Sequence, residues 1–302
     1  MYLITEAEWL APKVRRITIE APRVASHHLP GHFVIVRVRE GGERIPLTIA
    51  DSDRDTGTIT LVVQVVGATT EILCRQRAQE HVANVVGPLG KPTEVSDYGH
   101  AVLVGGGVGT AVIYPQAIAL KESGCKVSAV VGGRSKDYVI LETELSKHCD
   151  VVYPCTDDGS YGYHGFVTEK LKQLLEFTSD PIGAVLTAGP VPMMRAVSEV
   201  TRPFGIKTIA SLNPIMVDGT GMCGGCRVTV GGTMKFACVD GPEFDAHAVD
   251  FEELADRLTT YHTQEIIAWD RVRGAKLNSE PDNKFCRLSE AERSAVGVRQ
   301  SV

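Results

Sequence analysis

The sequence contains no block of basic residues, and this absence limits the partners that the protein can have. Its 302 residues include 31 Lys and Arg against 37 Asp and Glu, for a net charge of −6 at pH 7. Nucleic acid and anionic membrane surfaces are bound through concentrated positive charge. We therefore expect neither nucleic acid nor a membrane among the partners.

Long hydrophobic runs are also absent. The N-terminal stretch MYLITEAEWLAPKVRR lacks the basic start and apolar core of a secretory signal. The most apolar later stretch, PIGAVLTAGPVPMM, is short and is interrupted by Gly and Pro. We therefore expect no export signal and no membrane-spanning helix, and a cytoplasmic location fits best.

Regularly spaced cysteines, which would indicate a disulfide framework, are missing too. Five of the eight cysteines are scattered along the chain, namely Cys74, Cys125, Cys149, Cys155 and Cys286. The other three lie together between residues 217 and 241, so they need another explanation.

Four segments of different character follow one another. Residues 1–99 hold short β-rich runs such as HFVIVRV and TITLVVQVV between polar turns, the pattern of an antiparallel barrel or sandwich. Residues 100–209 alternate apolar strands with amphipathic stretches, which predicts an α/β domain around a parallel sheet. Residues 210–246 predict a small loop-and-hairpin module stabilised by a metal centre. Residues 247–302 predict a helical extension, N-capped by Asp250, that docks a partner or covers its own domain.

The stretch VLVGGGVGTA runs from an apolar strand through glycines into a predicted helix. Such a turn presents backbone N–H groups at a helix N-terminus, where a pyrophosphate can bind. Thr110 stands at the third glycine position of the usual dinucleotide fingerprint, and no acidic residue ends the next strand. From this motif alone, a phosphate-binding loop and a turn that needs Gly only for its backbone conformation are equally well supported.

The clustered cysteines have the spacing Asp-x4-Cys-x2-Cys-x11-Cys, formed by Asp218, Cys223, Cys226 and Cys238. Plant-type [2Fe-2S] ferredoxins use Cys-x4-Cys-x2-Cys with a distant fourth Cys, so this set has that spacing with one ligand changed. The alternatives are a structural zinc site, and a turn stabilised by Asp218 beside a free Cys-x2-Cys pair. Zinc sites usually combine two such pairs and the sequence has one, so we favour the iron-sulfur cluster.

Five stretches, in the order ERIPLTIAD, VVGATTEIL, GPLGKPT, VGGGVGTAVIYP and LTAGPVPMM, resemble the ferredoxin-NADP reductase superfamily over residues 1–209. In that superfamily an FAD-binding β-barrel precedes an NAD(P)-binding α/β domain. The resemblance implies that the flavin is lined by Arg44, Ile45, Pro46, Leu47 and Thr48, its diphosphate by Gly67, Thr69 and Thr70, and the nucleotide by Gly87, Pro88, Leu89 and Gly90. It also implies that the second nucleotide's pyrophosphate is held by Gly105, Gly106, Gly107, Gly109 and Thr110, with Gly189, Pro190 and Met193 near the nicotinamide.

The order of barrel, nucleotide domain and cysteine loop resembles the electron transfer subunit of bacterial dihydroorotate dehydrogenase, whose loop has four cysteines. The Asp-first loop DGTGMCGGCRVTVGG, with FACVDGPEFD and TDDGSYG, is more similar to the small subunits of NADH-dependent ferredoxin:NADP oxidoreductase. That resemblance implies an FAD that exchanges hydride with NAD(H) and single electrons with a [2Fe-2S] cluster, because a flavin can do both. It also implies a larger flavin and iron-sulfur subunit similar to the glutamate synthase small subunit, ferredoxin as a partner through the complex, and electron bifurcation.

The choice of nucleotide depends on residues that follow the second and third strands of the α/β domain. Arg134 and Lys136 favour a 2′-phosphate and hence NADP(H), whereas the resemblance favours NAD(H), which we adopt. Asp157 is placed to accept hydrogen bonds from a ribose, and a tight turn explains it equally well. Hydride transfer needs no side-chain acid, base or nucleophile, so no catalytic residue is predicted. The remaining alternative is a non-catalytic nucleotide-sensing subunit with a structural zinc loop.

Overall fold

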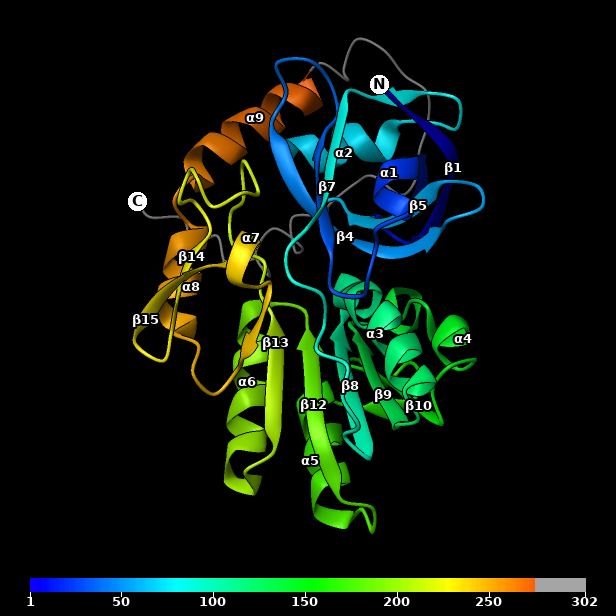
Figure 1. Cartoon of the computed structure of the whole chain (residues 1–302), viewed down its shortest axis with the longest axis vertical. Helices are drawn as coiled ribbons and strands as arrows, with labels where there is room; N and C mark the ends of the chain where they lie inside the picture. The colour runs from blue at the N-terminus through cyan, green and yellow to red at the C-terminus, as the bar shows by residue number, and fades with distance from the viewer. Residues whose placement is uncertain (275–302) are drawn as a thin grey trace.

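The computed structural model describes residues 1–274, and its first part is a nearly closed antiparallel barrel (Figure 1). The hydrogen-bonded order of its strands is β6-β1-β2-β5-β4-β3-β7. Only Ala83 separates β6 from β7, so the two ends of this order are neighbours in the chain. The strands are β1 (Tyr2–Ala11), β2 (Val14–Glu20), β3 (Phe33–Arg37), β4 (Arg44–Asp53), β5 (Thr58–Gln64), β6 (His81–Val82) and β7 (Asn84–Leu89).

The barrel interior is filled by branched apolar side chains. Ile17 and Ile19 of β2, and Ile59 and Leu61 of β5, alternate along their strands and are fully buried, as the pleat of a strand requires. Helix α1 (Pro22–Ala25) and helix α2 (Ala68–Arg75) contribute Val24 and Leu73 to the same core. The period-two pattern of the sequence therefore fixes which face of each strand is buried.

One buried histidine makes the stability of this barrel depend on pH. The Nδ1 atom of His28 lies 2.8 Å from Ser52 Oγ. Burial, and then the positive charges of His32 and Arg54, lower the pKa of His28 to about 4. The unfolded chain takes up a proton here near pH 6.5 and the folded protein does not, so stability falls as pH drops below about 6.5, by about 2 kcal/mol at pH 5.

Urea unfolding at about pH 7.5 and about pH 5 measures this. We expect His28→Gln to flatten the pH dependence and His27→Gln, at the exposed neighbour, to leave it unchanged; equal slopes for the wild type and His28→Gln would contradict the assignment.

The second sheet is parallel except at one edge, in the order β11-β10-β9-β8-β12-β13-β16. Only the pairing of β13 with β16 is antiparallel among the pairs of this sheet in residues 1–274. Its strands are β8 (His100–Gly106), β9 (Lys126–Gly133), β10 (Val151–Thr156), β11 (Tyr163–His164), β12 (Ile182–Ala188), β13 (Lys207–Ser211) and β16 (Glu243–Asp245). The predicted α/β class is confirmed.

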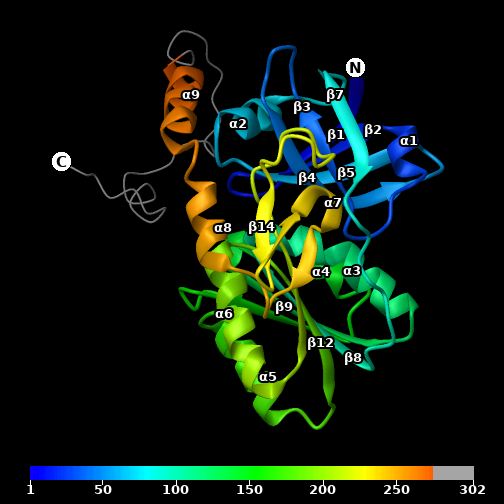
Figure 2. The same ribbon diagram turned by 60° about the vertical axis from the view of Figure 1, so that its left-hand side comes forward.

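Helices cover both faces of this sheet (Figures 1 and 2). The helical segments are η1 (Gly107–Gly109), α3 (Thr110–Glu122), η2 (Lys136–Tyr138), α4 (Glu142–Leu145), α5 (Val167–Phe177), α6 (Val191–Thr201) and η3 (Arg202–Phe204). Ile113 of α3 and Leu145 of α4 pack on one face, and Leu171 of α5 and Val197 of α6 pack on the other. Because both faces are covered, every residue of β8 is buried, which explains its unbroken apolar run.

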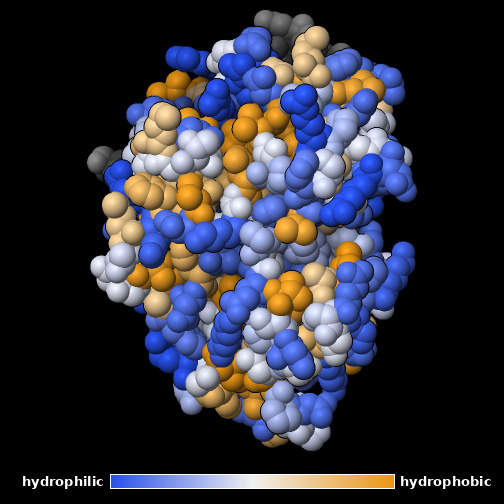
Figure 3. All heavy atoms as spheres, in the orientation of Figure 1, coloured by the Kyte–Doolittle hydropathy of each residue, from blue (hydrophilic) through white to orange (hydrophobic). Residues whose placement is uncertain are grey.

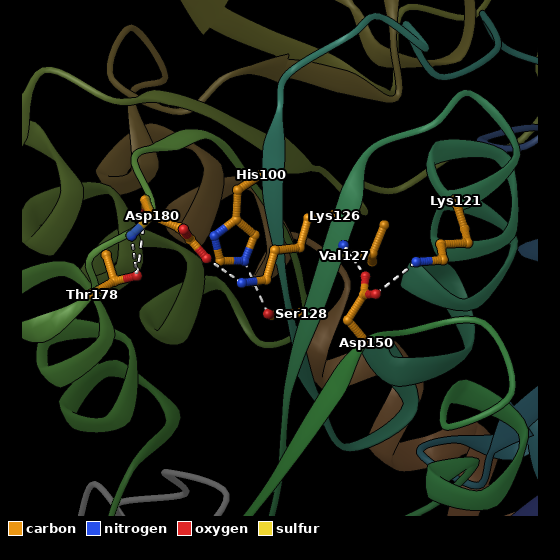
Figure 4. A network of polar contacts seen from close by, with 8 residues as sticks. All are labelled: His100, Lys121, Lys126, Val127, Ser128, Asp150, Thr178 and Asp180. Atoms are coloured by element: carbon orange, nitrogen blue, oxygen red, sulfur yellow. Dashed lines mark hydrogen bonds and ion pairs between the residues drawn. The ribbon is translucent and has the colours of Figure 1, made fainter.

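Polar contacts join the strands and neighbouring loops at the amino end of the sheet (Figure 4). Lys126 pairs with Asp180, and Lys121 Nζ lies 2.7 Å from Asp150 Oδ1. His100 Nε2 is 2.9 Å from Ser128 Oγ, and burial lowers the pKa of His100. These ion pairs are largely solvent-exposed and contribute little stability each. Their position leaves the opposite, carboxyl end of the strands open for ligands.

The cysteine stretch forms a hairpin module beside the barrel (Figure 2). Strands β14 (Arg227–Val230) and β15 (Thr233–Phe236) are joined by Gly231 and Gly232, whose φ values of 57° and 70° are those of a two-residue turn that favours glycine. Helix α7 (Ala237–Asp240) follows, and then β16 joins the edge of the α/β sheet. The module is thus connected by backbone pairing to the nucleotide domain.

The extension consists of helices α8 (Phe251–Leu258) and α9 (His262–Gly274). As expected, Asp250 caps α8, because its carboxylate accepts the backbone N–H groups of Glu252 and Glu253 at 3.1 and 2.9 Å. Helix α9 lies on α2 of the barrel (Figures 1 and 2). The rest of the predicted extension, with Cys286, lies outside the described residues. None of the helices in residues 1–274 combines the length and apolar character needed to cross a bilayer.

Candidate functional site

Two of the three clustered cysteines lie in contact. The Sγ atoms of Cys226 and Cys238 are 3.1 Å apart, and the backbone N–H of Cys238 points at Cys226 Sγ from 3.5 Å. Both are buried, whereas Cys223 is exposed and has the N–H of Gly225 3.5 Å from its sulfur. Burial, and then the neighbouring Cys226, raise the pKa of Cys238 to about 12. A thiol in this setting ionises only when a metal takes the place of its proton.

Asp218 organises the loop that carries the exposed cysteine. Its Oδ2 accepts the N–H of Cys223 at 2.6 Å, and its Oδ1 accepts the N–H of Thr220 and, at 2.9 Å, the Thr220 hydroxyl. These donors lower the pKa of Asp218, the N–H of Thr220 most. The turn-stabilising role weighed for Asp218 is therefore present in the structure, and ligation by Asp218 stays a prediction.

The backbone of the loop and the N–H groups at its sulfur atoms fit an iron-sulfur cluster. Gly219 and Gly221 have φ values of 80° and 82°, a conformation in which glycine lets the backbone curl around a group. Within residues 1–274, no three His, Cys, Asp or Glu side chains converge on one point that would hold one metal ion. A closed zinc site requires four ligands around one point. Sulfur atoms that receive backbone N–H groups, as those of Cys223 and Cys226 do, are typical of iron-sulfur sites.

Replacing Asp218 by Cys tests whether Asp218 is a ligand of the iron or only stabilises the turn. If the carboxylate ligates iron, Asp218→Cys should retain two irons and shift the midpoint potential by roughly 50 mV or more, since the ligand set is a main determinant of cluster potential. Redox titration followed by EPR spectroscopy measures this. Asp218→Asn is the matched control, because it keeps one of the turn's two acceptor oxygens but weakens ligation. An unchanged potential in Asp218→Cys would leave the aspartate as a turn former only.

An apolar cluster connects the thiols to the barrel. Phe33 and Ile35 of β3 and Leu89 of β7 pack in the same hydrophobic cluster as Cys226 and Cys238. A Cβ on Gly219 would lie 2.5 Å from Leu89 Cδ1, so this glycine lets the loop lie directly on β7. Strand β3 in turn pairs with β4, where Thr48 is the partner of Phe33. Strand β3 and its apolar side chains therefore lie between the predicted flavin strand β4 and the thiols of Cys226 and Cys238.

The start of the predicted flavin strand meets the start of α2. Residues 44–48 lie on β4, and the backbone N–H groups of Val66 and Gly67 both lie 3.0 Å from Thr70 Oγ1 at the start of α2. The Thr69 hydroxyl donates to the carboxylate of Glu43, next to Arg44. Residues 87–89 lie on β7 and Gly90 follows it. The sequence reasoning missed Glu43, although it opens the quoted motif ERIPLTIAD.

The predicted pyrophosphate loop lies at the point where the strand order of the sheet reverses. The chain proceeds from β8 outward to β9 and β10 on one side and returns to β12 on the other, and Gly105 is the partner of Ala188 across this point. A Cβ on Gly109 would lie 2.1 Å from Ala188 O, and one on Gly106 would lie 2.4 Å from Met193 Sδ. Close approach thus explains these two glycines, while Gly107 has a φ of 54°. Open parallel sheets bind ligands in the crevice at such a reversal.

Arg134 and Asp157 lie at the same carboxyl end of the sheet. The N–H of Asp157 donates to Gly133 O at 3.2 Å, which places the loops after β9 and β10 side by side. Burial raises the pKa of Asp157, and the charge of Arg134 opposes this shift. Gly189 and Pro190 lead from β12 into α6, and Met193 lies in its first turn. The glycine loop, Arg134, Asp157 and the start of α6 thus lie at one edge of the sheet, where the charge of Arg134 acts on the carboxyl group of Asp157.

A half-buried carboxylate, also missed from the sequence, joins three parts of the protein. Oε1 of Glu243 in β16 accepts the Thr93 hydroxyl and the Gln116 side-chain amide, each at 2.7 Å. Thr93 follows the barrel, Gln116 is in α3, and β16 follows the cysteine module. Burial raises the pKa of Glu243, more than these two donors lower it. The barrel, the nucleotide domain and the module therefore meet at one oxygen atom.

Comparison with known proteins gives a consistent set of matches. Residues 213–250 match the family model described as the iron-sulfur cluster binding domain of dihydroorotate dehydrogenase B. The chain is 47% identical over 262 residues to a dihydroorotate dehydrogenase B (NAD(+)) electron transfer subunit homolog of Thermotoga maritima, covering 87% of this chain and 92% of that protein. It is 32% identical to the electron transfer subunit of that enzyme from Geobacillus thermodenitrificans, covering 82% and 96%.

Solved structures extend these matches. The structure of an NADH-dependent reduced ferredoxin-NADP oxidoreductase, described as giving insights into flavin-based electron bifurcation, has a chain 45% identical to this one with a TM-score of 0.85, covering 90% of this chain and 97% of that one. A ferredoxin NADP+ reductase from Neisseria gonorrhoeae with bound FAD and NADP is 16% identical with a TM-score of 0.57, covering 68% and 93%. The second match supports the fold alone, a barrel followed by a nucleotide domain.

Proposed function

Since this chain belongs to the family of dihydroorotate dehydrogenase B electron transfer subunits and their homologues, we propose that it is the small subunit of a bifurcating NADH-dependent ferredoxin:NADP oxidoreductase. It is an electron transfer subunit of a flavin and iron-sulfur oxidoreductase, with FAD and a [2Fe-2S] cluster as cofactors and NAD(H) as its nucleotide. The observation that carries the finer assignment is the 45% identity, over 90% of the chain, to the bifurcating enzyme's structure. The cysteine loop, which begins with Asp218, also favours this assignment.

The chain's own residues position and insulate the cofactors. When bound, FAD exchanges hydride with a nicotinamide and single electrons with an iron-sulfur cluster. The N-terminus of α2 and the guanidinium of Arg44 favour the negative flavin diphosphate. The crevice where the strand order reverses, beside Gly105 and Ala188, would hold the nucleotide. Cys223, Cys226 and Cys238 would hold the cluster. Phe33 and Leu89 keep water out of the space between.

An exposed apolar rim beside the cluster loop supports a protein partner. Val217, Met222 and Val239 flank the proposed ligands, and their exposed fractions are 46%, 88% and 45%. Apolar atoms also gather over this side of the molecule in Figure 3. We propose that a larger flavin and iron-sulfur subunit, similar to the glutamate synthase small subunit, covers this rim and that ferredoxin reacts through the complex. The cytoplasmic location stays a prediction.

The matched family model favours a second candidate, the electron transfer subunit of a dihydroorotate dehydrogenase. Anaerobically purified protein is first tested for its spectrum, iron, acid-labile sulfide and zinc, and for an EPR signal after dithionite reduction. Flavin, two irons, two sulfides and a one-electron signal are expected; zinc without sulfide would contradict both candidates.

With the co-purified partner, NADPH-driven reduction of both ferredoxin and NAD⁺ supports the bifurcating enzyme, whereas NAD⁺ reduction by dihydroorotate supports the second candidate.

A further inference from the structure

Helix α8 of the C-terminal extension packs on the cysteine module. Phe251, Leu254 and Leu258 of this helix pack in the same apolar cluster as Cys226 and Cys238. Figures 1 and 2 show α8 beside β14. This part of the extension therefore covers the chain's own module, and it begins one residue after the region that matches the iron-sulfur family model.

Arg257, in the last turn of α8, contacts the loop between two of the proposed ligands. Its Nη2 donates to the carbonyl oxygen of Gly225 at 3.3 Å. The backbone N–H of Gly225 in turn points at Cys223 Sγ from 3.5 Å. One residue of the loop thus accepts the guanidinium at its carbonyl and directs its N–H at a sulfur atom. By holding the carbonyl, Arg257 helps to fix the direction of that N–H.

The charge of Arg257 lies in surroundings that screen it weakly. The side chain is half-buried, and its Nε atom is buried without a hydrogen-bond partner within residues 1–274. A buried donor without a partner costs free energy, so its presence calls for a reason. The bond to Gly225 goes to a neutral carbonyl and leaves the positive charge in place. A poorly solvated charge acts more strongly on its neighbours than one in water.

A second guanidinium lies at the same loop. Arg227 directly follows Cys226, and a Cβ on Gly224 would lie 2.8 Å from Arg227 Nη1. Gly224 also has a φ of 65°, so a side chain is disfavoured there on both counts. The two-residue stretch between the cysteines is therefore bordered by the positive charges of Arg227 and Arg257.

We propose that Arg257 is a positioning residue of the iron-sulfur site, and that it raises the midpoint potential of this site by placing a positive charge beside it. Thiolate and carboxylate ligands make such a centre negative, and an accepted electron adds one more negative charge. A nearby guanidinium therefore favours the reduced form over the oxidised form. This role rests on the proposed binding of the cluster at Cys223, Cys226 and Cys238, and it extends the site to a helix outside the matched family model.

Two substitutions of Arg257 separate its charge from its packing. Arg257→Gln keeps an N–H donor and removes the charge, whereas Arg257→Lys keeps the charge. In the full-length, anaerobically purified protein, Arg257→Gln should retain two irons and be reduced roughly tenfold less readily, which is a midpoint potential about 59 mV lower for a one-electron centre. Arg257→Lys should restore most of this shift. Redox titration followed by EPR spectroscopy measures the potential of the cluster. The flavin potential, read from absorbance in the same titration, should stay constant.

Arg195→Gln is the matched control. Arg195 also contacts α8, but its charge is balanced by Glu199 and Glu252 at 3.0 and 3.3 Å, so the cluster potential should equal that of the wild type. An unchanged potential in Arg257→Gln with two irons bound would overturn the proposal. Equal loss of iron from both Arg257 variants would overturn it too, because a purely structural contact would have that effect. Wild-type protein without iron and sulfide would refute the cluster assignment itself, and this is recognised before any variant is compared.

Discussion

Replacing Cys226 by serine is expected to abolish the one-electron iron-sulfur signal while the flavin stays bound. Cys226 is buried, and its sulfur lies 3.1 Å from that of Cys238, at the centre of the module. A serine hydroxyl ionises far less readily than a thiol and is a poor ligand for iron. Iron and sulfide per chain should fall by about tenfold or more, since structural metal affinity depends on the complete ligand set. The flavin absorbance should remain because the predicted flavin residues lie in the barrel.

Cys155→Ser is the matched control for this experiment. Cys155 is also buried, and burial raises its pKa to about 12, but it lies in β10, far from the module in sequence. It should keep two irons and the full EPR signal. Retention of iron in Cys226→Ser together with loss in Cys155→Ser would mean that the cluster is ligated by a different set of cysteines.

Patterns local in sequence predicted the architecture correctly. The run TITLVVQVV forms a barrel strand in which Ile59, Leu61 and Val63 are buried, because period two selects a buried face. The unbroken run AVLVGG, residues 101–106, gives a strand covered on both faces. The predicted hairpin is present, and the structure places its turn at Gly231 and Gly232; the cap predicted at Asp250 is present as well.

Contacts between distant residues were not predictable in the same way. The partners of Glu243 lie 150 and 127 positions away, and no periodicity links them. Glu43 contacts Thr69 across 26 positions because β4 and α2 meet in space. The glycine loop gave two equal interpretations because the close approach of Gly109 to Ala188 exists only once β8 and β12 are paired.

Glu243→Ala is expected to destabilise the protein by about 3 kcal/mol, because it leaves two buried donors, from Thr93 and Gln116, without an acceptor and opens a cavity. Glu243→Gln should restore most of this stability, since its carbonyl oxygen accepts the same two bonds. Urea unfolding of the anaerobic holoprotein measures both. Glu94→Ala is the control: Glu94 pairs with Lys207 at 3.1 Å on the surface, and such pairs contribute about 1 kcal/mol or less.

The pH dependence of these variants identifies the form of Glu243 that the fold selects. Burial raises its pKa, so the folded protein holds a proton at pH values where the unfolded chain has lost it. Stability from this residue is therefore present below the ordinary pKa of a glutamate and falls as pH rises through the raised value. Glu243→Gln carries no such proton and should remove this slope while keeping the hydrogen bonds. A glutamine variant as unstable as the alanine variant would instead show that a charged carboxylate holds the three parts together. Glutamine offers the same accepting oxygen as Glu243 Oε1 but carries no charge.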